Sequence, residues 1–335
     1  LQDHHYISNQ YIFVAQLINL ILKWDCSKTK KQHFVSVYFE RLEKYCRKFY
    51  ALNIKIFNRN SVNSVQKYNQ ILDLKIWLKN PLSILAENAE GGILIEGTHI
   101  IELIPSGKQP TSLYDSVFDA SCHVILPGLI NLHHHFYQTL TRVYPQALNK
   151  ELFPWLKTLY PLWAGITPEA LRMATRLALA ELLLSGCTTA SDHHYVFPAG
   201  QEQAIDSQIE EAHNLGIRVV LCRGSMDRSQ KDGGLPPDSV VQTCDEILED
   251  SERLIQQYHN TNTGAMTQIA LAPCSPFSVS ETVMRESAKL AEKNNVLLHT
   301  HLAETEDENS FCLETIGCRP LEYLEQVGWL NYKTW

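Results

Sequence analysis

The first 80 residues of the chain contain neither glycine nor proline. The first proline is Pro81 and the first glycine is Gly91, so all 14 prolines and all 15 glycines lie in the later part of the sequence. These two residues form most tight turns, and a folded domain is difficult to build without them. Charge divides the chain in the same way, because residues 1–75 hold 12 Lys and Arg against 5 Asp and Glu, whereas the remainder holds 17 against 32. We therefore expect residues 1–72 to be a separate, poorly defined basic segment.

The sequence also lacks a hydrophobic run that could cross a membrane. Its longest apolar run, residues 11–22, includes Gln16 and Asn19 and falls short of the ~18–20 apolar residues that a spanning helix needs. No basic region precedes this run, so a secretory signal is not indicated. The net charge of -8 argues against general binding to nucleic acid. We expect a protein that binds neither membranes nor nucleic acid, and the sequence leaves open whether it forms a homo-oligomer.

Cysteines are scattered through the chain rather than grouped. The nine cysteines include no CxxC pair and show no regular spacing. In a chain of this size, such cysteines are usually small buried side chains of a protein from a reducing compartment. The expected location is therefore the cytoplasm.

From residue 73 onward the sequence consists of short, regular segments. Residues 73–123 predict a small β module, in which Glu96-Gly97-Thr98 forms a hairpin turn. Residues 124–335 alternate between strand-like and helix-like segments, which predicts a parallel sheet covered by helices. The expected strands are 74–78, 93–95, 99–104 and 117–119, then 124–132, 187–191, 217–223, 267–273 and 296–301, and the expected helices are 168–184, 200–215, 238–258, 280–294 and 306–327, the last broken near Gly317.

The number of βα units separates two fold classes. Five such units precede Trp335, which would complete a doubly wound sheet but would leave a (β/α)8 barrel without its last three units. The histidine motifs described next favour the barrel. The expected fold class is therefore α/β, an incomplete (β/α)8 TIM barrel of about five βα units, preceded by a small β-sandwich module.

A run of histidines closes the first expected strand of the barrel, in the order His133, His134, His135. Side chains two residues apart on a strand share a face, so His133 and His135 can point to one ion while His134 points away. Neutral imidazole is a common ligand of zinc. An expression tag would give a similar run, but a tag would lie at a terminus rather than after an apolar strand. The run therefore predicts two metal ligands.

The fifth expected strand ends in a second motif, which runs from His299 through His301 to Glu304. His301 and Glu304 are three residues apart where the strand becomes a loop, so both can face one pocket. Metal-assisted hydrolysis needs a metal that lowers the pKa of its bound water, and a free carboxylate that then moves the proton. HxxE is common by itself, and it becomes specific when it is paired with the HxH run. Together the motifs predict a mononuclear hydrolase site with Glu304 as the catalytic residue and His133, His135 and His301 as metal ligands.

Other chemistries lack their characteristic residues. The sequence contains no HExxH metalloprotease motif, no P-loop and no GxGxxG. Cytidine deaminases need P-C-x-x-C, and the segment Pro273-Cys274-Ser275-Pro276-Phe277 places Phe277 where the second cysteine belongs. These absences argue against a zincin protease, a nucleotide-binding enzyme and a cytidine deaminase.

Several segments resemble the amidohydrolase superfamily. The stretch from Val124 to His135 is similar to the entry into the barrel of that superfamily, and residues 299–305 resemble the fifth-strand motif of its deaminase branch. The resemblance extends from about Leu74 to Trp335 and does not reach residues 1–72. Within the branch, the sequence looks most similar to the 8-oxoguanine deaminase family, and this likeness is carried by residues 133–141, 151–155, 182–189, 233–241 and 272–279.

The resemblance implies one Zn2+ per subunit on the three histidine ligands, with Glu304 as the proton shuttle. It also makes Gln138 a residue that binds the heterocyclic substrate, and the alternative for this side chain is loop packing. Arg223, at the end of the third strand, could meet a substrate carbonyl or form a structural ion pair. His193 and His194 end the second strand, and we take His194 as the one that lines the substrate pocket, with packing in the core as the alternative. These assignments are expectations from the family likeness.

The function that the resemblance implies is zinc-dependent hydrolytic deamination of an oxidised purine, from 8-oxoguanine to urate and ammonia. A guanine or hydroxy-triazine aminohydrolase of the same superfamily is the alternative. The family also uses a histidine on the sixth strand and an aspartate on the eighth, and both would lie beyond Trp335. A truncated, inactive fragment that still binds metal is therefore a third hypothesis, and on this basis the chain as given is expected to be inactive.

Overall fold

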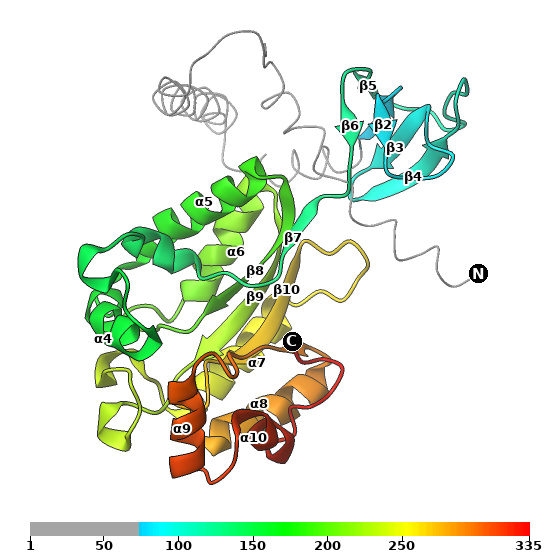
Figure 1. Ribbon diagram of the computed structural model, residues 1–335. Coiled ribbons are helices and arrows are strands. Elements are labelled where there is room, and N and C mark those ends of the chain that lie inside the picture. Colours follow the sequence, from blue (N-terminus) through cyan, green and yellow to red (C-terminus); the bar gives the residue numbers. More distant parts are fainter. Residues whose placement is uncertain (1–73) are drawn as a thin grey trace. The chain divides into compact units, whose positions relative to one another are not determined.

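The computed structural model describes residues 74–335, and these residues form parts of two compact units. The first unit ends at Gly128, and the second is Leu129–Trp335 (Figure 1). The basic segment 1–72 expected from the sequence lies outside the described residues.

The described part of the first unit is a small β structure. Its main sheet has the strand order β4-β3-β1-β5, in which β3 is antiparallel to both β1 and β4, and β5 is parallel to β1. A second, two-stranded sheet pairs β2 with β6 in parallel. The strands are β1 (Lys75–Lys79), β2 (Ser83–Ile84), β3 (Gly92–Glu96), β4 (His99–Ile104), β5 (Ser116–Asp119) and β6 (Val124–Ile125).

Both faces of this main sheet carry apolar side chains. Trp77, Leu94 and Ile104 pack together in one cluster, whereas Leu78 and Ile93 belong to another. Neighbouring residues on a strand point to opposite faces, which places the two clusters on opposite sides of the sheet. The core of the first unit is therefore built from apolar side chains on both sides.

The start of the second unit differs from the boundary at residue 124 that the sequence suggested. Val124 and Ile125 form β6, which pairs with β2 of the first unit, and the side chain of Ile125 is buried in the core of that unit. The next strand, β7 (Leu129–Asn131), begins after Gly128 and belongs to the second unit. The expected strand 124–132 is thus two strands in different units, because Pro127-Gly128 interrupts a continuous apolar run.

The second unit contains a five-stranded parallel sheet with the order β11-β10-β9-β8-β7. Each strand lies beside the strand that precedes it in the chain. A barrel has this simple order, whereas a doubly wound sheet reverses direction at a switch point. The sheet is curved, and helices cover one side of it (Figure 1). The prediction of an incomplete (β/α) barrel is confirmed, with strands β7, β8 (Cys187–His194), β9 (Arg218–Ser225), β10 (Thr267–Pro273) and β11 (Leu297–Leu298).

Local sequence signals fix the helices between these strands. The hydroxyl of Thr167 accepts a hydrogen bond from the amide of Ala170 at 3.2 Å, which caps the expected helix that starts at Pro168. Thr243 and Glu246 form a capping box at another helix start. No helix within the described ranges is both long enough and apolar enough to span a membrane. The helices are α4 (Leu152–Trp163), α5 (Pro168–Leu184), α6 (Ala204–Leu215), α7 (Cys244–Tyr258), α8 (Glu281–Asn294), α9 (Glu306–Thr315) and α10 (Pro320–Gln326), with short 3-10 turns η2 (Phe136–Thr141), η3 (Pro145–Ala147), η4 (Gln230–Asp232) and η5 (Asp238–Val240).

The fifth strand is shorter than the range 296–301 that the sequence suggested. Only Leu297 and Leu298 belong to β11, but the chain stays bonded beyond them, because the amide of His301 donates to the carbonyl of Cys274 at 3.0 Å. On its other side, Leu298 forms an isolated parallel bridge to Thr334. The motif from His299 to His301 therefore lies beside the carboxyl end of β10.

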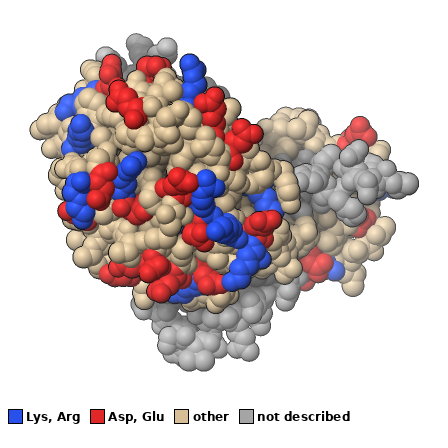
Figure 2. Space-filling model, turned by 90° about the horizontal axis from the view of Figure 1, so that it is seen from below, with Lys and Arg blue, Asp and Glu red and all other residues tan. Residues whose placement is uncertain are grey.

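Charged side chains of both signs are interleaved on the face of the molecule shown in Figure 2. Ion pairs of the second unit include Arg253 with Asp206 at 2.7 Å and Arg172 with Glu210 at 2.6 Å. Pairs in contact with solvent contribute only about 0–1 kcal/mol each. The fold must therefore rely on its buried residues more than on this layer of charge.

Candidate metal centre

Three histidine rings converge at the carboxyl ends of the first and fifth strands of the parallel sheet. His133 and His135 follow β7, and His301 follows β11. The Nε2 atoms of His133 and His135 are 3.1 Å apart, and those of His135 and His301 are 3.2 Å apart. One ligand atom from each of the three residues lies within 4.8 Å of the others. These distances suit nitrogen ligands around a single ion at about 2.0–2.1 Å from each.

The hydrogen bonds on the far side of two rings determine where their protons lie. Nδ1 of His135 is 2.7 Å from the carbonyl oxygen of His193, and Nδ1 of His301 is 2.7 Å from that of Cys274. A carbonyl can only accept, so each Nδ1 carries the hydrogen. In the neutral rings, both Nε2 atoms then present lone pairs to one another and cannot form a hydrogen bond. A cation between them would satisfy both, and this fits the second-shell pattern of metal-binding histidines.

Partial desolvation favours the neutral form of these rings, of which His133 is exposed and the other two are half-buried. It lowers the pKa of His133 to about 4, with repulsion from His301 adding to the effect. It also lowers the pKa of His135 well below its usual value and lowers that of His301. Neutral imidazole is the form that binds zinc. The donor set, its protonation and its spacing therefore all fit a zinc ion.

His134 lies on the other side of the chain from this cluster. Its ring packs against Phe136, with the ring centroids 5.2 Å apart. Its carbonyl oxygen accepts a hydrogen bond from the amide of His193 at 2.8 Å. The alternation of side chains thus separates His134 from its two neighbours, as the strand geometry predicts.

Glu304 follows a sharp turn of the backbone after His301. The turn passes through Ala303, whose φ of 54° lies in the left-handed region. The amide of Glu304 donates to Oε2 of the buried Glu308 at 2.8 Å, and this bond holds the turn. Within the described residues, Glu304 belongs to neither group of side chains with metal-ligand spacing. Its carboxylate is thus free to act on something other than the ion.

The electrostatics of Glu304 connect it with the same region. Its side chain is solvent-accessible, yet partial burial still raises its pKa. Burial also raises the pKa of Tyr195 well above its usual value, and the charge of Glu304 adds a smaller contribution. The ring of Tyr195 lies 5.3 Å from that of His135, measured between centroids. Glu304 therefore shares its surroundings with the histidine cluster.

Gln138 is half-buried near the cluster. Its Nε2 lies 3.4 Å from the hydroxyl oxygens of both Tyr137 and Tyr195. Because Tyr195 also packs on His135, Gln138 is one side chain away from the convergent histidines. Its amide oxygen and nitrogen could each meet a heterocycle edge from this position.

The comparisons with known proteins agree with this geometry. Residues 124–335 match the model of the amidohydrolase family. The chain belongs to the amidohydrolase family. It is 58% identical over 264 residues to the 8-oxoguanine deaminase of Pseudomonas aeruginosa, and the match covers 78% of this chain and 59% of that relative.

Solved amidohydrolase-like structures show the same architecture. The triazine hydrolase of Arthrobacter aurescens superposes with a TM-score of 0.72 at 29% identity, covering 78% of this chain and 60% of that one. The atrazine chlorohydrolase of Arthrobacter aurescens TC1, complexed with zinc, superposes with a TM-score of 0.68 at 28% identity and covers 78% and 59%. The chain therefore spans about three fifths of the length of the relatives it matches. Members of this family depend on metal, and His133, His135 and His301 form one of two groups of histidines here that could hold it.

Of the paired histidines on the second strand of this amidohydrolase chain, His193 joins the cluster. Its ring stacks on that of His301 with centroids 4.3 Å apart and an angle of 14° between planes. His194 was the residue chosen from the sequence, but neighbours on a strand face opposite ways, and its ring packs on Tyr137 and Phe197 instead. Both ring nitrogens of His194 are buried without a hydrogen-bond partner, and burial lowers its pKa to about 3.

Arg223 is buried at the end of β9, where protein partners surround it. Its Nε pairs with Asp250 at 2.9 Å, and one of its terminal nitrogens donates to Gln242 at 2.8 Å. The guanidinium also lies 4.0 Å from the centroid of the Phe197 ring. The sequence left two roles open for Arg223, contact with a substrate carbonyl or a structural ion pair. The contacts seen here are those of a structural ion pair.

Asp192 was undecided from the sequence, and it lies fully buried beside the first-strand ligands. One oxygen accepts from the amide of Phe136 and the other from Nε2 of Gln208, both at 2.6 Å. Burial raises the pKa of Asp192 to about 7. Its bond to Phe136 holds the backbone directly after His135, and its bond to Gln208 fixes the carboxylate against α6. The βα pattern alone could not reveal this role.

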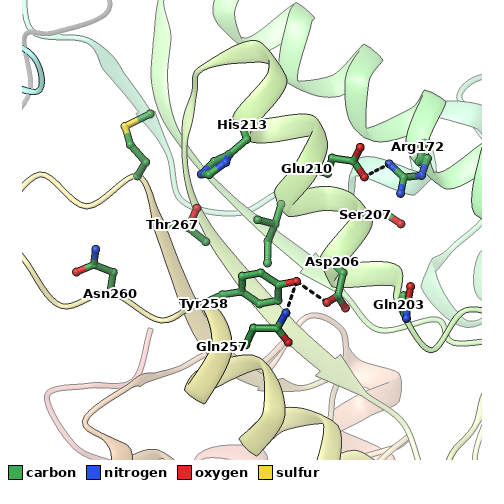
Figure 3. Close-up of a pocket in the computed structure, with 12 residues that line it drawn as sticks. Arg172, Gln203, Asp206, Ser207, Glu210, His213, Gln257, Tyr258, Asn260 and Thr267 are labelled. Carbon is green, nitrogen blue, oxygen red and sulfur yellow. Dashed lines mark hydrogen bonds and ion pairs between the residues drawn. The ribbon is translucent and has the colours of Figure 1, made fainter. Parts of the chain in front are cut away.

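A hollow of about 670 Å³ lies elsewhere in the second unit, and Figure 3 shows its lining. It is formed mainly by α6 and α7, and none of the three candidate ligands lines it. Charged groups of its lining have protein partners, since Arg172 pairs with Glu210 at 2.6 Å and the hydroxyl of Tyr258 donates to Asp206 at 2.7 Å (Figure 3). The three candidate ligands lie instead at the carboxyl ends of the strands, where barrels of this kind place their active sites.

Proposed function

We propose that the chain contributes to a zinc-dependent hydrolytic deaminase that converts 8-oxoguanine to urate and ammonia. One zinc per chain would be held by His133, His135 and His301. The observation that carries the proposal is the convergence of the Nε2 atoms 3.1 and 3.2 Å apart, on rings whose other nitrogens are tied to carbonyls. The substrate class is supported by 58% identity to an 8-oxoguanine deaminase over 264 residues.

The reaction replaces an exocyclic amine with oxygen. A bound zinc would supply Lewis acidity that polarises a water molecule towards deprotonation near neutral pH. The new C–O bond forms at the ring carbon that bears the amine, and the C–N bond then breaks. One water supplies the oxygen and two hydrogens: one hydrogen leaves in ammonia with the two of the amine, and the other stays on the ring.

Glu304 is the residue we assign to the proton transfers. Its carboxylate takes the proton from the attacking water and returns it to the ring nitrogen or the departing amine. The raised pKa of Glu304 suits this exchange, because a carboxylate whose pKa is closer to neutrality is a stronger base towards the attacking water and can still return the proton near neutral pH. The left-handed turn at Ala303 is what directs this side chain away from the path of the strand.

Substrate recognition is assigned first to Gln138. Its amide can donate and accept at once, which suits the edge of a purine that alternates carbonyl and N–H groups. Arg223 and His194 remain secondary candidates, because the first is ion-paired with Asp250 and the second packs among aromatic rings. Either would have to exchange a protein contact for a substrate contact.

The second candidate function is hydrolysis of a triazine or deamination of guanine at the same site. The observation in favour of a triazine is the TM-score of 0.72 to a triazine hydrolase. The identity of 29% to that protein is half the 58% to the 8-oxoguanine deaminase, which is why the purine stands first.

Two measurements test the proposal. Metal analysis of the 335-residue chain should find one zinc per chain, and His135→Ala should abolish it. Urate formation from 8-oxoguanine should be followed in the chain itself and in a chimera that joins residues 74–335 to the remaining C-terminal sequence of the Pseudomonas aeruginosa relative. A chimera that folds and binds zinc but forms no urate, and instead releases ammonia from guanine or a hydroxy-triazine, would replace the purine assignment with the alternative.

A further inference from the structure

One of the three candidate ligands differs from the other two in what holds its second nitrogen. His135 and His301 each direct Nδ1 to a backbone carbonyl. Nδ1 of His133 lies instead 3.0 Å from Nε2 of another imidazole, that of His299. A carbonyl can only accept a hydrogen bond, but an imidazole nitrogen can donate or accept, depending on its tautomer. The proton on His133 is therefore not fixed by the backbone.

The direction of this hydrogen bond decides whether His133 can bind a metal. With the hydrogen on Nδ1 of His133, its Nε2 has a free lone pair directed towards Nε2 of His135, 3.1 Å away. With the hydrogen on Nε2 of His299 instead, Nδ1 of His133 would accept, and its Nε2 would carry a hydrogen that excludes an ion. The tautomer of His299 thus determines whether Nε2 of His133 has a lone pair free for a metal.

The surroundings of His299 provide a partner for the competent direction. Its own Nδ1 lies 3.5 Å from the sulfur of Cys222, which in turn lies 3.4 Å from the hydroxyl of Ser191. Sulfur accepts hydrogen bonds, so a hydrogen on Nδ1 of His299 has a partner and leaves Nε2 free to accept from His133. The ring is 4% exposed, and Trp335 packs over it with centroids 4.5 Å apart. Its orientation is therefore held from several sides.

We infer that His299 is a positioning residue that fixes His133 in the metal-binding tautomer, through the relay His133 Nδ1–H to His299 Nε2 and His299 Nδ1–H to Cys222. This inference rests on the proposed metal site. It goes beyond that site by assigning a role to His299, the first histidine of the segment His299-Thr300-His301, which binds no metal in the proposal. It also explains why the imidazole of His299 is buried beside the ligands, although burying an apolar side chain there would cost less free energy.

A second cation on this side of the cluster is the competing arrangement. His133, His193 and His299 also have ligand atoms within 4.8 Å of one another. His193 donates from Nε2 to the carbonyl of Ala272 at 2.9 Å, and its Nδ1 is buried without a partner. An ion there would require His133 to give up both nitrogens to metal, which a neutral imidazole cannot do. We therefore assign this group to hydrogen bonding rather than to a second ion.

The test measures zinc affinity of the 335-residue chain by competition with a fluorescent chelator. His299→Phe keeps a flat ring but removes the acceptor, and it should weaken zinc binding about 10–100-fold. His299→Gln places an amide oxygen near the position of Nε2 and should recover most of that loss. His134→Phe makes the same replacement one residue from His133, outside the cluster, and should leave the affinity unchanged.

The outcomes separate the inference from the proposed function. Wild-type affinity in His299→Phe, equal weakness of the Phe and Gln variants, or two zinc ions per wild-type chain would each overturn the relay while the metal site stands. Absence of zinc from the wild-type chain would overturn the proposed site itself. If His299→Phe does not fold, nitrogen-15 spectra of the zinc-bound wild type decide the matter: His133 should be protonated at Nδ1, and protonation at Nε2 would refute the relay.

Discussion

The two units bury different kinds of side chain. In the described part of the first unit, the buried residues are apolar, as Trp77, Leu94 and Ile104 illustrate. Every buried polar or charged residue that the structure describes belongs to the second unit, and several of them, such as Asp192 and His299, lie at the carboxyl ends of its strands. Burying a polar group without a full set of partners costs about 1–3 kcal/mol. The second unit therefore carries a stability cost wherever its buried polar groups lack partners, as both ring nitrogens of His194 do.

The two units are also stabilised by different kinds of interaction. The first unit depends on contacts between apolar side chains on both faces of a sheet. The second depends in addition on directional hydrogen bonds, such as those from the amide of Phe136 to Asp192 and from the amide of Glu304 to Glu308. Changes in the first unit should therefore alter stability alone, and changes at the strand ends of the second should alter chemistry.

The largest effect should follow from Glu304→Gln. The amide cannot take a proton from water, so turnover of the zinc-loaded chimera should fall about 10²–10⁴-fold, while zinc stoichiometry stays at one per chain. Glu306→Gln, two residues further along at the exposed start of α9, is the matched control and should leave turnover unchanged. An equal loss of zinc in Glu304→Gln would make this residue a ligand or a structural carboxylate.

Next in size is the loss of stability from Leu94→Ala in the first unit. Leu94 is fully buried with Trp77 and Ile104, and truncating such a side chain typically costs about 2–5 kcal/mol. Denaturant titration should show this loss, and metal analysis should still find zinc on the chain. Val117→Ala, on the same sheet but 47% exposed, is the control and should change stability by less than about 0.5 kcal/mol. Loss of zinc in Leu94→Ala would show that zinc binding in the second unit depends on the packing of the first unit.

Much of the fold could be predicted from the sequence, because its signals are local. The helix expected over 168–184 matches α5 (Pro168–Leu184), since a threonine cap, a first-turn proline and an apolar stripe all agree. The hairpin turn at Glu96-Gly97-Thr98 lies between β3 and β4 for the same reason. Helix α4 (Leu152–Trp163) was missed, because Pro154 and Pro161 break the usual helical pattern.

In the candidate site too, features set by local spacing could be predicted from the sequence, and features set by tertiary contacts could not. The spacing of His133 and His135 on a strand indicates a shared face, and the structure brings their nitrogens within 3.1 Å. No local pattern says which of His193 and His194 faces the cluster, because that depends on the register of β8 between two other strands. The partner of Arg223, Asp250, lies 27 residues away and could not be found from spacing.

A smaller effect should come from Asp192→Ala. The change leaves the amide of Phe136 and Nε2 of Gln208 buried without an acceptor, which should cost about 1–3 kcal/mol of stability and weaken zinc binding at the adjacent ligands. Asp192→Asn should be milder, because Gln208 can turn its amide and offer the oxygen that now lacks a partner. Asp238→Ala, an exposed carboxylate paired with Lys231 at 3.6 Å, is the control. Equal effects of Ala and Asn would show that the carboxylate charge matters rather than its bonds.

The smallest expected effect is a nearly constant zinc affinity between pH 7.5 and pH 6. Protons compete with zinc only when the pH approaches the pKa of the ligands. Three histidines with the ordinary pKa of about 6.5 would lose roughly 50-fold in affinity over this range. Desolvation lowers the pKa of His133 to about 4 and lowers the pKa values of His135 and His301, so protons should compete less with zinc and the loss should be clearly smaller than 50-fold.

The same pKa shifts determine how the stability of the metal-free chain depends on pH. In the unfolded chain His133 takes up a proton near pH 6.5, but in the folded chain it does so only near pH 4, so the metal-free chain loses stability as the pH falls through this window. Equilibrium dialysis against zinc at the two pH values measures the binding, and a 50-fold weakening at pH 6 would show that the three rings keep their ordinary pKa values.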